Sequence, residues 1–151
     1  MSMTATTYTS SEDMECLNLF LKNELAAVET YGQCIESIQD AGVAINLRDL
    51  QRSHEKRAEL LTRKITQLGG QPEVDSGLWG DFAKLVEGGA AMLGNKTAIN
   101  ALEKGEKRGE EQYRAKLDEM TPDVRAFVSV SLLPEHETCQ QILQRVERMV
   151  H

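Results

Sequence analysis

The sequence predicts an all-α protein, in which four long amphipathic helices form two antiparallel hairpins joined by a long crossover that carries a short fifth helix. The composition favours helix, because Ala, Leu, Glu, Lys, Arg and Gln are abundant and Pro occurs only three times. Apolar residues recur at intervals of three and four along four long segments. The turns inside each pair of segments are short, which makes the paired helices antiparallel neighbours.

The first hairpin is expected between residue 10 and the Gly pair at 69–70. A capping-box pattern at residues 9–12 begins its first helix, and Gly42 is suited to cap that helix at its C-terminal end. The polar residues 1–9 are expected to form a disordered tail, which leaves residues 10–151 as one bundle domain. The inward faces of the two helices are read as Leu17, Phe20, Glu24, Ala27, Tyr31, Ile35 and Ile38, followed by Leu47, Leu50, His54, Ala58, Leu61, Ile65 and Leu68.

The crossover and the second hairpin follow. A loop at 71–77 leads to a short helix at 78–93, which the Gly88-Gly89 pair weakens. In the second hairpin, Thr121 is expected to cap the last helix, and Pro134 inside that helix is expected to kink it. The inward faces here are read as Ile99, Leu102, Glu106, Gly109, Tyr113, Leu117 and Met120, followed by Val124, Val128, Leu132, His136, Cys139, Leu143, Val146 and Val150.

An internal repeat relates the two hairpins. Glu24, Tyr31 and His54 each have the same residue type 82 positions later, at Glu106, Tyr113 and His136. The chain holds only three His and three Tyr, so a shared offset is improbable by chance. We interpret the repeat as two related hairpins packed about a pseudo-twofold axis. This arrangement would direct two carboxylates and two imidazoles inward at similar heights along the bundle.

Two interpretations of this polar set are open at the level of sequence. Burying a carboxylate costs several kcal/mol of free energy unless the group is protonated, paired or bound to a cation. In the first interpretation a divalent metal ion is bound by Glu24, His54, Glu106 and His136. In the second, each Glu hydrogen-bonds to a His in a metal-free polar network. The hydroxyls of Tyr31 and Tyr113 would support either arrangement by hydrogen bonding.

Several stretches resemble known helical proteins. Residues 23–31, NELAAVETY, look like the first-helix motif of bacterioferritins, and residues 54–72, HEKRAELLTRKITQLGGQP, are similar to their second helix and its exit. The later stretches SGLWGDFAKLVEGGAAMLG, ALEKGEKRGEEQY and SLLPEHE resemble a bacterial ferritin-like family of unknown function. The resemblance to the ferritin-like superfamily thus covers nearly the whole chain.

This resemblance implies a ferritin-like four-helix bundle with a carboxylate-bridged di-iron or di-manganese site. Glu24 and Glu106 match the glutamates of the first and third helices, while His54 and His136 match the histidines of a Glu-x-x-His motif on the other two. The glutamates of that motif are absent, because their positions hold Gln51 and Leu133. The expected site is therefore a reduced one with a single Fe, Mn or Zn ion.

Two functions are carried forward. One is a metal-binding, ferritin-like protein in iron handling or oxidative-stress chemistry, and the other is a metal-free bundle that serves as a structural or interaction module. Whether the chain is an enzyme stays open. A homo-oligomer is expected in either case, with a dimer favoured.

Composition argues against other classes of partner. The net charge is −7 with acids and bases interleaved, which gives no basic surface for nucleic acid or an anionic membrane. No apolar run is long enough for a membrane span, and the start is too polar for a signal peptide. The odd number of cysteines, Cys16, Cys34 and Cys139, and the lack of a CxxC pair favour reduced thiols in a cytoplasmic protein.

Overall fold

A computed structural model describes residues 11–75, 77–87 and 94–150 of the chain. Its described residues contain helices and no strand, so the predicted all-α bundle is confirmed. Each described helix is too short or too polar to span a lipid bilayer. The elements are α2 (Ser11–Ser37), α3 (Ala41–Gln67), α4 (Gly80–Glu87), α5 (Asn95–Lys116), the 3₁₀ turn Leu117–Glu119, α6 (Pro122–Phe127), the π-helical turn Val128–Leu132 and α7 (Leu133–Met149).

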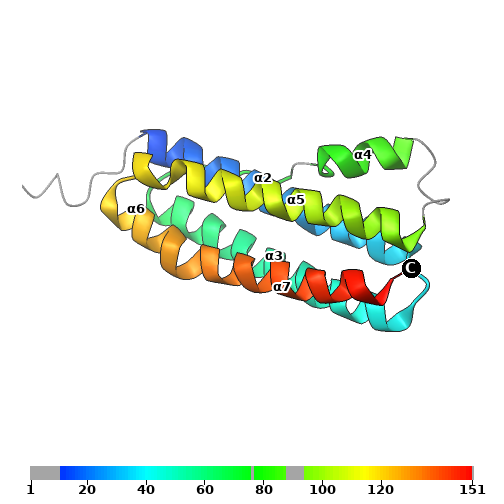
Figure 1. Ribbon diagram of the computed structural model, residues 1–151. Coiled ribbons are helices and arrows are strands. Elements are labelled where there is room, and N and C mark those ends of the chain that lie inside the picture. Colours follow the sequence, from blue (N-terminus) through cyan, green and yellow to red (C-terminus); the bar gives the residue numbers. More distant parts are fainter. Residues whose placement is uncertain (1–10, 76, 88–93, 151) are drawn as a thin grey trace, which may run out of the picture.

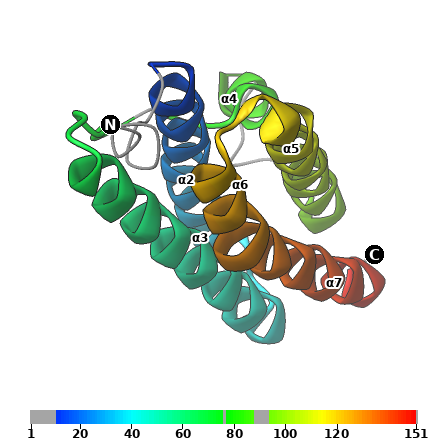
Figure 2. The same cartoon turned by 90° about the vertical axis from the view of Figure 1, so that its left-hand side faces the viewer.

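The long helices form a bundle in which every adjacent pair is antiparallel (Figures 1 and 2). Helix α2 packs against α3 and α5, and α7 packs against the same two helices from the opposite corner. The chain leaves α3 at one end of the bundle and returns along its length through α4 before α5 begins at the other end (Figure 1). The predicted pair of hairpins with a long crossover is therefore what the chain forms.

Local chemistry explains the limits of α3. Its N-cap is Asp40, whose Oδ1 accepts a hydrogen bond of 3.0 Å from the Val43 N–H. It ends where Gly69 adopts a φ of 85°, a conformation that favours glycine, and the Gly70 N–H donates to the Ile65 carbonyl at 2.9 Å. Gly42 therefore lies in the first turn of α3, and the predicted C-terminal cap at Gly42 is wrong because α2 already ends at Ser37. The predicted tail 1–9 and the first half of the capping box lie outside the described residues.

The start of the last helix differs from the prediction in one respect. Pro122 occupies the first turn, as expected, but the Thr121 side chain makes no capping bond. Its hydroxyl donates instead to Asp13 Oδ2 at 2.6 Å, and its backbone N–H donates to Asp13 Oδ1 at 3.1 Å. A carboxylate of α2 thus competes successfully for the hydroxyl and ties the second hairpin to the start of the first.

The predicted kink at Pro134 takes the form of a π-helical turn. The Leu133 N–H donates to the Val128 carbonyl, five residues earlier, directly before the proline that has no N–H of its own. Fourteen residues separate Pro122 from His136, whereas thirteen separate Ala41 from His54. Because a π turn accommodates one extra residue, it brings His136 onto the inward face that His54 occupies in the first hairpin.

The crossover is anchored by Trp79. Its backbone N–H donates to Thr30 Oγ1 at 2.9 Å, and its indole N–H donates to Asn23 Oδ1 at 3.0 Å. The ring lies against Gly105 of α5, where a Cβ would come within 2.1 Å of an indole carbon. The predicted helix at 78–93 is described as α4 over Gly80–Glu87, and residues 88–93 lie outside the described part of the chain.

The core has two apolar clusters with a polar layer between them. One cluster includes Phe20, Leu61 and Val128, and the other includes Leu47, Ile99 and Leu143. The residues between the clusters on the four long helices are Glu24, His54, Arg57, Glu106 and His136, and all of them are buried. The polar layer therefore crosses the middle of the bundle.

Candidate functional site

The candidate site is this buried polar layer, to which each of the four long helical segments contributes. Glu24 comes from α2, His54 from α3, Glu106 from α5 and His136 from α7. All four are at most 1% exposed. The repeat thus brings the predicted carboxylates and imidazoles to one level of the core, as the equal spacings within each hairpin suggested.

The two tyrosines bond across the repeat. Tyr31 on α2 donates its hydroxyl to Glu106 Oε2 on α5, while Tyr113 on α5 donates to Glu24 Oε2 on α2 at 2.5 Å. Both phenols are buried, and burial together with the facing carboxylate raises the pKa of each well above its ordinary value. They therefore act as neutral donors, and the exchange of partners follows the pseudo-twofold relation between the hairpins.

His54 lies between the two carboxylates. Its Nδ1 is 2.5 Å from Glu24 Oε1, and its Nε2 is 2.7 Å from Glu106 Oε2. A carboxylate can only accept, so both ring nitrogens donate and the ring is an imidazolium. Burial alone would lower the pKa of His54, but the attraction of Glu106 and Glu24 outweighs burial, and its pKa is raised.

A fifth polar residue, Arg57, completes the layer. It is fully buried, and its Nη1 is 3.6 Å from Glu24 Oε2 and 2.9 Å from His136 Nδ1. Its Nη2 donates to Cys139 Sγ at 3.4 Å. Burial would lower the pKa of Arg57, but Glu24 outweighs burial and raises it, so the guanidinium stays charged. Since His54 Nδ1 already donates to Glu24, the 3.0 Å approach of Arg57 Nη2 to that nitrogen is a contact between two cations.

His136 plays a different part from His54. Its Nε2 donates to the backbone carbonyl of Glu106 at 2.7 Å, and its Nδ1 accepts from Arg57. Burial and the neighbouring guanidinium lower the pKa of His136, which keeps the ring neutral. Gly109 makes room for this ring, because a Cβ at that position would lie 3.2 Å from His136 Cε1.

The charges of the layer balance. Burial raises the pKa of Glu24, but Arg57 and His54 outweigh burial and lower it to about 2. Burial likewise raises the pKa of Glu106, and His54 outweighs it, so the net direction is again downward. Two carboxylates therefore face one guanidinium and one imidazolium, and the layer is neutral as a whole. The layer therefore needs no metal ion among its side chains to balance its charge.

These side chains do not fit the metal site that the ferritin-like resemblance implies. Both nitrogens of His54 are bonded to carboxylates, and neither nitrogen of His136 is free. Gln51 turns out of the layer and donates to the Val28 carbonyl at 3.0 Å, while Leu133 packs in an apolar cluster. In the described part of the chain, no group of three or more His, Cys, Asp or Glu side chains is arranged to hold a metal ion.

Sequence reasoning missed Arg57, although two signals pointed to it. It follows His54 by three residues, about 60° round the helix, which keeps it near the inward face. It also stands 82 residues before Cys139, which occupies the equivalent place in the second hairpin. The three cysteines are free and buried, as expected. The Arg57–Cys139 mismatch is what makes the two histidines inequivalent.

Comparisons with known proteins agree with this fold. The family model described as a domain of unknown function, DUF2383, matches residues 12–119, a range that includes Glu24, His54, Arg57 and Glu106. A crystal structure of a conserved hypothetical protein, rv2844, from Mycobacterium tuberculosis superposes with a TM-score of 0.72. The superposition covers 91% of this chain and 92% of that chain at 20% sequence identity, which shows the fold alone. Among curated proteins none matches the chain.

These matches do not confirm the resemblance to the ferritin-like superfamily, since neither carries a ferritin description. The family model nevertheless spans more than half of the chain, from the start of α2 to the turn after α5. On that evidence the chain belongs to the DUF2383 family, a family of unknown function.

Proposed function

We propose that the chain is a metal-free helical bundle that serves as a structural or interaction module, with the polar layer as its internal framework. The observation that carries this proposal is the buried guanidinium of Arg57, 3.6 Å from Glu24 and 2.9 Å from His136. A cation supplied by the chain itself stands beside the carboxylate and imidazole that a metal ion would use. The competing proposal is one Fe, Mn or Zn ion held by Glu24, His54, Glu106 and His136, in iron handling or oxidative-stress chemistry.

Charge supports the metal-free alternative. Adding a divalent ion to a neutral, buried layer would leave two uncompensated positive charges, and desolvated charge of this kind costs several kcal/mol, on the order of the stability of a whole domain. Metal binding would also require His54 to give up a proton that two carboxylates hold. The layer therefore favours its own ion pairs over an added metal.

Interaction with a partner would then use the outer faces of the bundle. A second copy of the chain is the partner that the sequence favours. Ile45 and Met149 are 58% and 44% exposed where α3 begins and α7 ends, and both are apolar. We propose that this end of the bundle contributes to the contact between copies.

Metal analysis of protein purified without chelator tests the proposal. After incubation with Fe, Mn or Zn and removal of excess ion, we expect wild type and the Glu24→Ala/Glu106→Ala variant to retain equal, substoichiometric amounts of metal. About one ion per chain in the wild type that disappears in the variant would favour the competing proposal. Sedimentation equilibrium of the same samples reports the oligomeric state, and an Ile45→Asp/Met149→Asp variant should shift a dimer toward monomer.

A further inference from the structure

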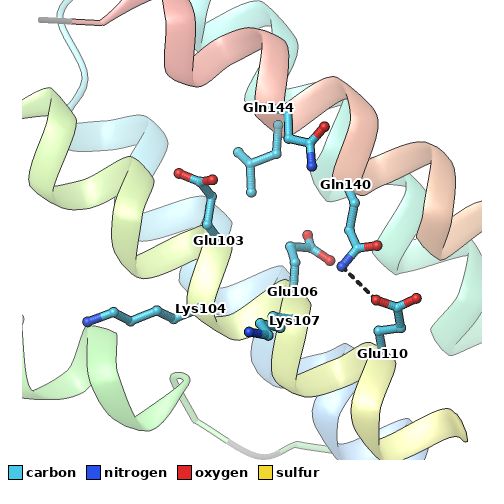
Figure 3. A pocket seen from close by; sticks show the side chains of 8 residues that line it. Glu103, Lys104, Glu106, Lys107, Glu110, Gln140 and Gln144 are labelled. Carbon is cyan, nitrogen blue, oxygen red and sulfur yellow. Dashed lines mark hydrogen bonds between the residues drawn. The ribbon is translucent and has the colours of Figure 1, made fainter.

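A cleft between α5 and α7 reaches the edge of the polar layer (Figure 3). Its volume is about 450 Å³, which is enough for a small organic molecule. The α5 side chains that line it lie one turn apart, and the α7 side chains face them (Figure 3). The lining residues are Glu103, Lys104, Glu106, Lys107, Glu110, Gln140, Leu143 and Gln144.

One residue of the cleft lining, Glu106, has a carboxylate oxygen without a hydrogen bond among the described residues. Glu106 is 1% exposed, and its Oε1 has no hydrogen-bond partner among the described residues. The ionisable atom close to Oε1 is His136 Nδ1, at a distance of 3.6 Å. That nitrogen accepts from Arg57, so it has no proton to offer. A buried acceptor left unpaired is unfavourable, and because Glu106 also lines the cleft, a donor bound there would relieve this deficit.

The side of the cleft holds a carboxyl group that is bonded to another carboxyl group. Glu103 on α5 shares a hydrogen bond with Glu147 on α7, and burial together with that neighbour raises the pKa of Glu103 to about 7. Glu110 is balanced by contrast, because Arg114 Nε donates to it at 3.0 Å and Gln140 Nε2 donates to it at 3.1 Å. Glu103 thus lines the cleft without an ion pair to a cation among the described residues.

The lysines of the lining do not supply this cation. Lys104 and Lys107 are exposed, and neither has an ion pair with a carboxylate of the cleft. Figure 3 shows Lys104 extending away from Glu106 and Gln140. The cleft therefore combines an acidic interior, an apolar wall at Leu143 and positive charge confined to its rim.

We propose that this cleft binds a small organic cation with a primary ammonium group, which donates to Glu106 Oε1 and contacts Glu103. An ammonium carries three N–H donors and accepts no hydrogen bond, which suits a site made of acceptors. The aliphatic part of the ligand would pack on Leu143. A divalent metal ion suits the cleft less well, because no group of three or more metal-binding side chains occurs in the described residues. Because Glu106 belongs both to this cleft and to the polar layer, the proposal rests on the metal-free function proposed for the core.

Calorimetric titration of the full chain with 1,4-diaminobutane tests the proposal, with 1,4-butanediol as the uncharged control. We expect a dissociation constant in the millimolar range, about 1 mM, for the diamine and no binding of the diol. Glu103→Gln should weaken binding about tenfold, and Gln144→Trp, which fills the cleft from an exposed position, should abolish it. Glu59→Gln, at an exposed carboxylate of α3, is the matched control and should bind like the wild type.

Binding of the diamine that is equal in wild type, Glu103→Gln and Gln144→Trp would overturn the proposal, as would the absence of heat up to about 20 mM ligand. A crystal structure grown with the diamine that shows only water at Glu106 Oε1 would overturn it as well. Glu106 belongs to both sites, so the titration uses protein shown by metal analysis to be metal-free. Stoichiometric metal in the core would contradict the proposed function, whereas equal diamine binding by metal-free wild type and variants would contradict only the cleft proposal, so the two failures are distinguishable.

Discussion

At the scale of single residues, Arg57 decides the electrostatics of the core. Without it the layer would hold two carboxylates against one imidazolium, and Glu24 would keep only His54 and the Tyr113 hydroxyl as partners. From α3 the guanidinium reaches Glu24, His136 and Cys139. The apolar pattern of α3 alone does not tell whether residue 57 points into the core or out of it. Its length and fork of donors allow one side chain to contact two other helices, α2 and α7.

Replacing Arg57 with Met should destabilise the protein strongly. Met keeps much of the volume but leaves a buried carboxylate uncompensated, and we expect a loss of about 3–5 kcal/mol in the free energy of unfolding. Urea denaturation at pH 7 measures the loss. Arg52→Met is the control, because Arg52 on the same helix is 75% exposed, and its change should stay within about 0.5 kcal/mol. Equal effects of the two substitutions would show that Arg57 carries no special role.

The lowered pKa of Glu24 predicts a loss of stability in acid. In the folded state its pKa is about 2, against an ordinary value of 4.5, so the unfolded chain takes up the proton first as the pH falls. The contribution is complete above pH 4.5 and is lost between pH 4.5 and about 2, on the order of 3 kcal/mol in all. Urea unfolding across this range should show a shallower pH dependence for Glu24→Gln than for wild type. Parallel curves would rule the linkage out.

His54 contributes with the opposite sign. Its pKa is raised in the folded state, so its stabilisation is complete below its ordinary pKa of 6.5 and is lost as the pH rises through the folded value. The pKa of His136 is lowered in the folded state, so the unfolded chain takes up this proton first as the pH falls. Like Glu24, His136 therefore lowers the stability of the folded state at low pH. The layer is therefore most stable at intermediate pH.

At the scale of elements, the crossover depends on a close contact between Trp79 and Gly105. A Cβ on residue 105 would lie 2.1 Å from Trp79 Cε3, too close for the ring to stay in place. The ring is 6% exposed, and its centroid lies 5.9 Å from that of His54, so it also covers the polar layer on this side. Glycine is required here for space rather than for an unusual backbone angle.

Gly105→Ala should therefore displace Trp79, although Ala is the better helix former. We expect a destabilisation of about 1–3 kcal/mol and a red shift of tryptophan emission as the ring meets water. Trp79 is the single Trp of the chain, which makes the emission specific to this site. Gly80→Ala, where a Cβ would meet nothing within 4 Å, is the control and should leave both quantities nearly unchanged. An unshifted emission maximum in Gly105→Ala would contradict the prediction.

The π-helical turn Val128–Leu132 is the other decisive element. Sequence reasoning placed a kink at Pro134 and matched His136 to His54 by offset alone. Relative to α3, the last helical segment starts one residue early, at Pro122. The π turn accommodates that residue, so that His54 and His136, 82 residues apart, occupy equivalent positions. The interruption before Pro134 is thus part of what places His136 at the position equivalent to that of His54.

At the scale of the whole molecule, the polar layer divides one core into two apolar clusters. A buried ionic layer often adds little net stability, because the cost of desolvation offsets the attraction between charges. In a metal-free module, its value would then lie in fixing which helices meet and at what height. The reciprocal Tyr31–Glu106 and Tyr113–Glu24 bonds, which join α2 to α5 across the repeat, support this view.

Replacing the four charged residues of the layer and its two tyrosines by apolar residues should preserve the fold. The variant carries Glu24→Leu, Tyr31→Phe, His54→Phe, Arg57→Met, Glu106→Leu and Tyr113→Phe. With no charge left unpaired, we expect stability between that of the wild type and about 4 kcal/mol above it, measured by urea denaturation with circular dichroism. Glu24→Leu alone should cost about 3–5 kcal/mol and serves as the contrast. A six-fold variant that fails to fold would show that the charges are indispensable to the bundle.

Much of the fold could be read from the sequence because it is local. Helix periodicity identified the long helices and their inward faces, and the Gly pair at 69–70 marked the end of α3 correctly. The predicted cap at Thr121 failed because a distant group competed for its hydroxyl. Asp13, more than a hundred residues away, takes the Thr121 hydroxyl that the sequence assigned to a cap.

By itself the sequence determined that two carboxylates, two imidazoles and two phenols would meet in the core, since the repeated spacings and the helical period suffice for that. Only the tertiary structure decided how their charges are balanced. Arg57 enters the layer because Glu24 and His136, on two other helices, offer it acceptors, and no pattern along α3 encodes those contacts. The same packing leaves Glu106, a residue of the cleft lining, with its Oε1 unpaired among the described residues. Charge compensation depends on distances between helices, and those distances exist only once the bundle has formed.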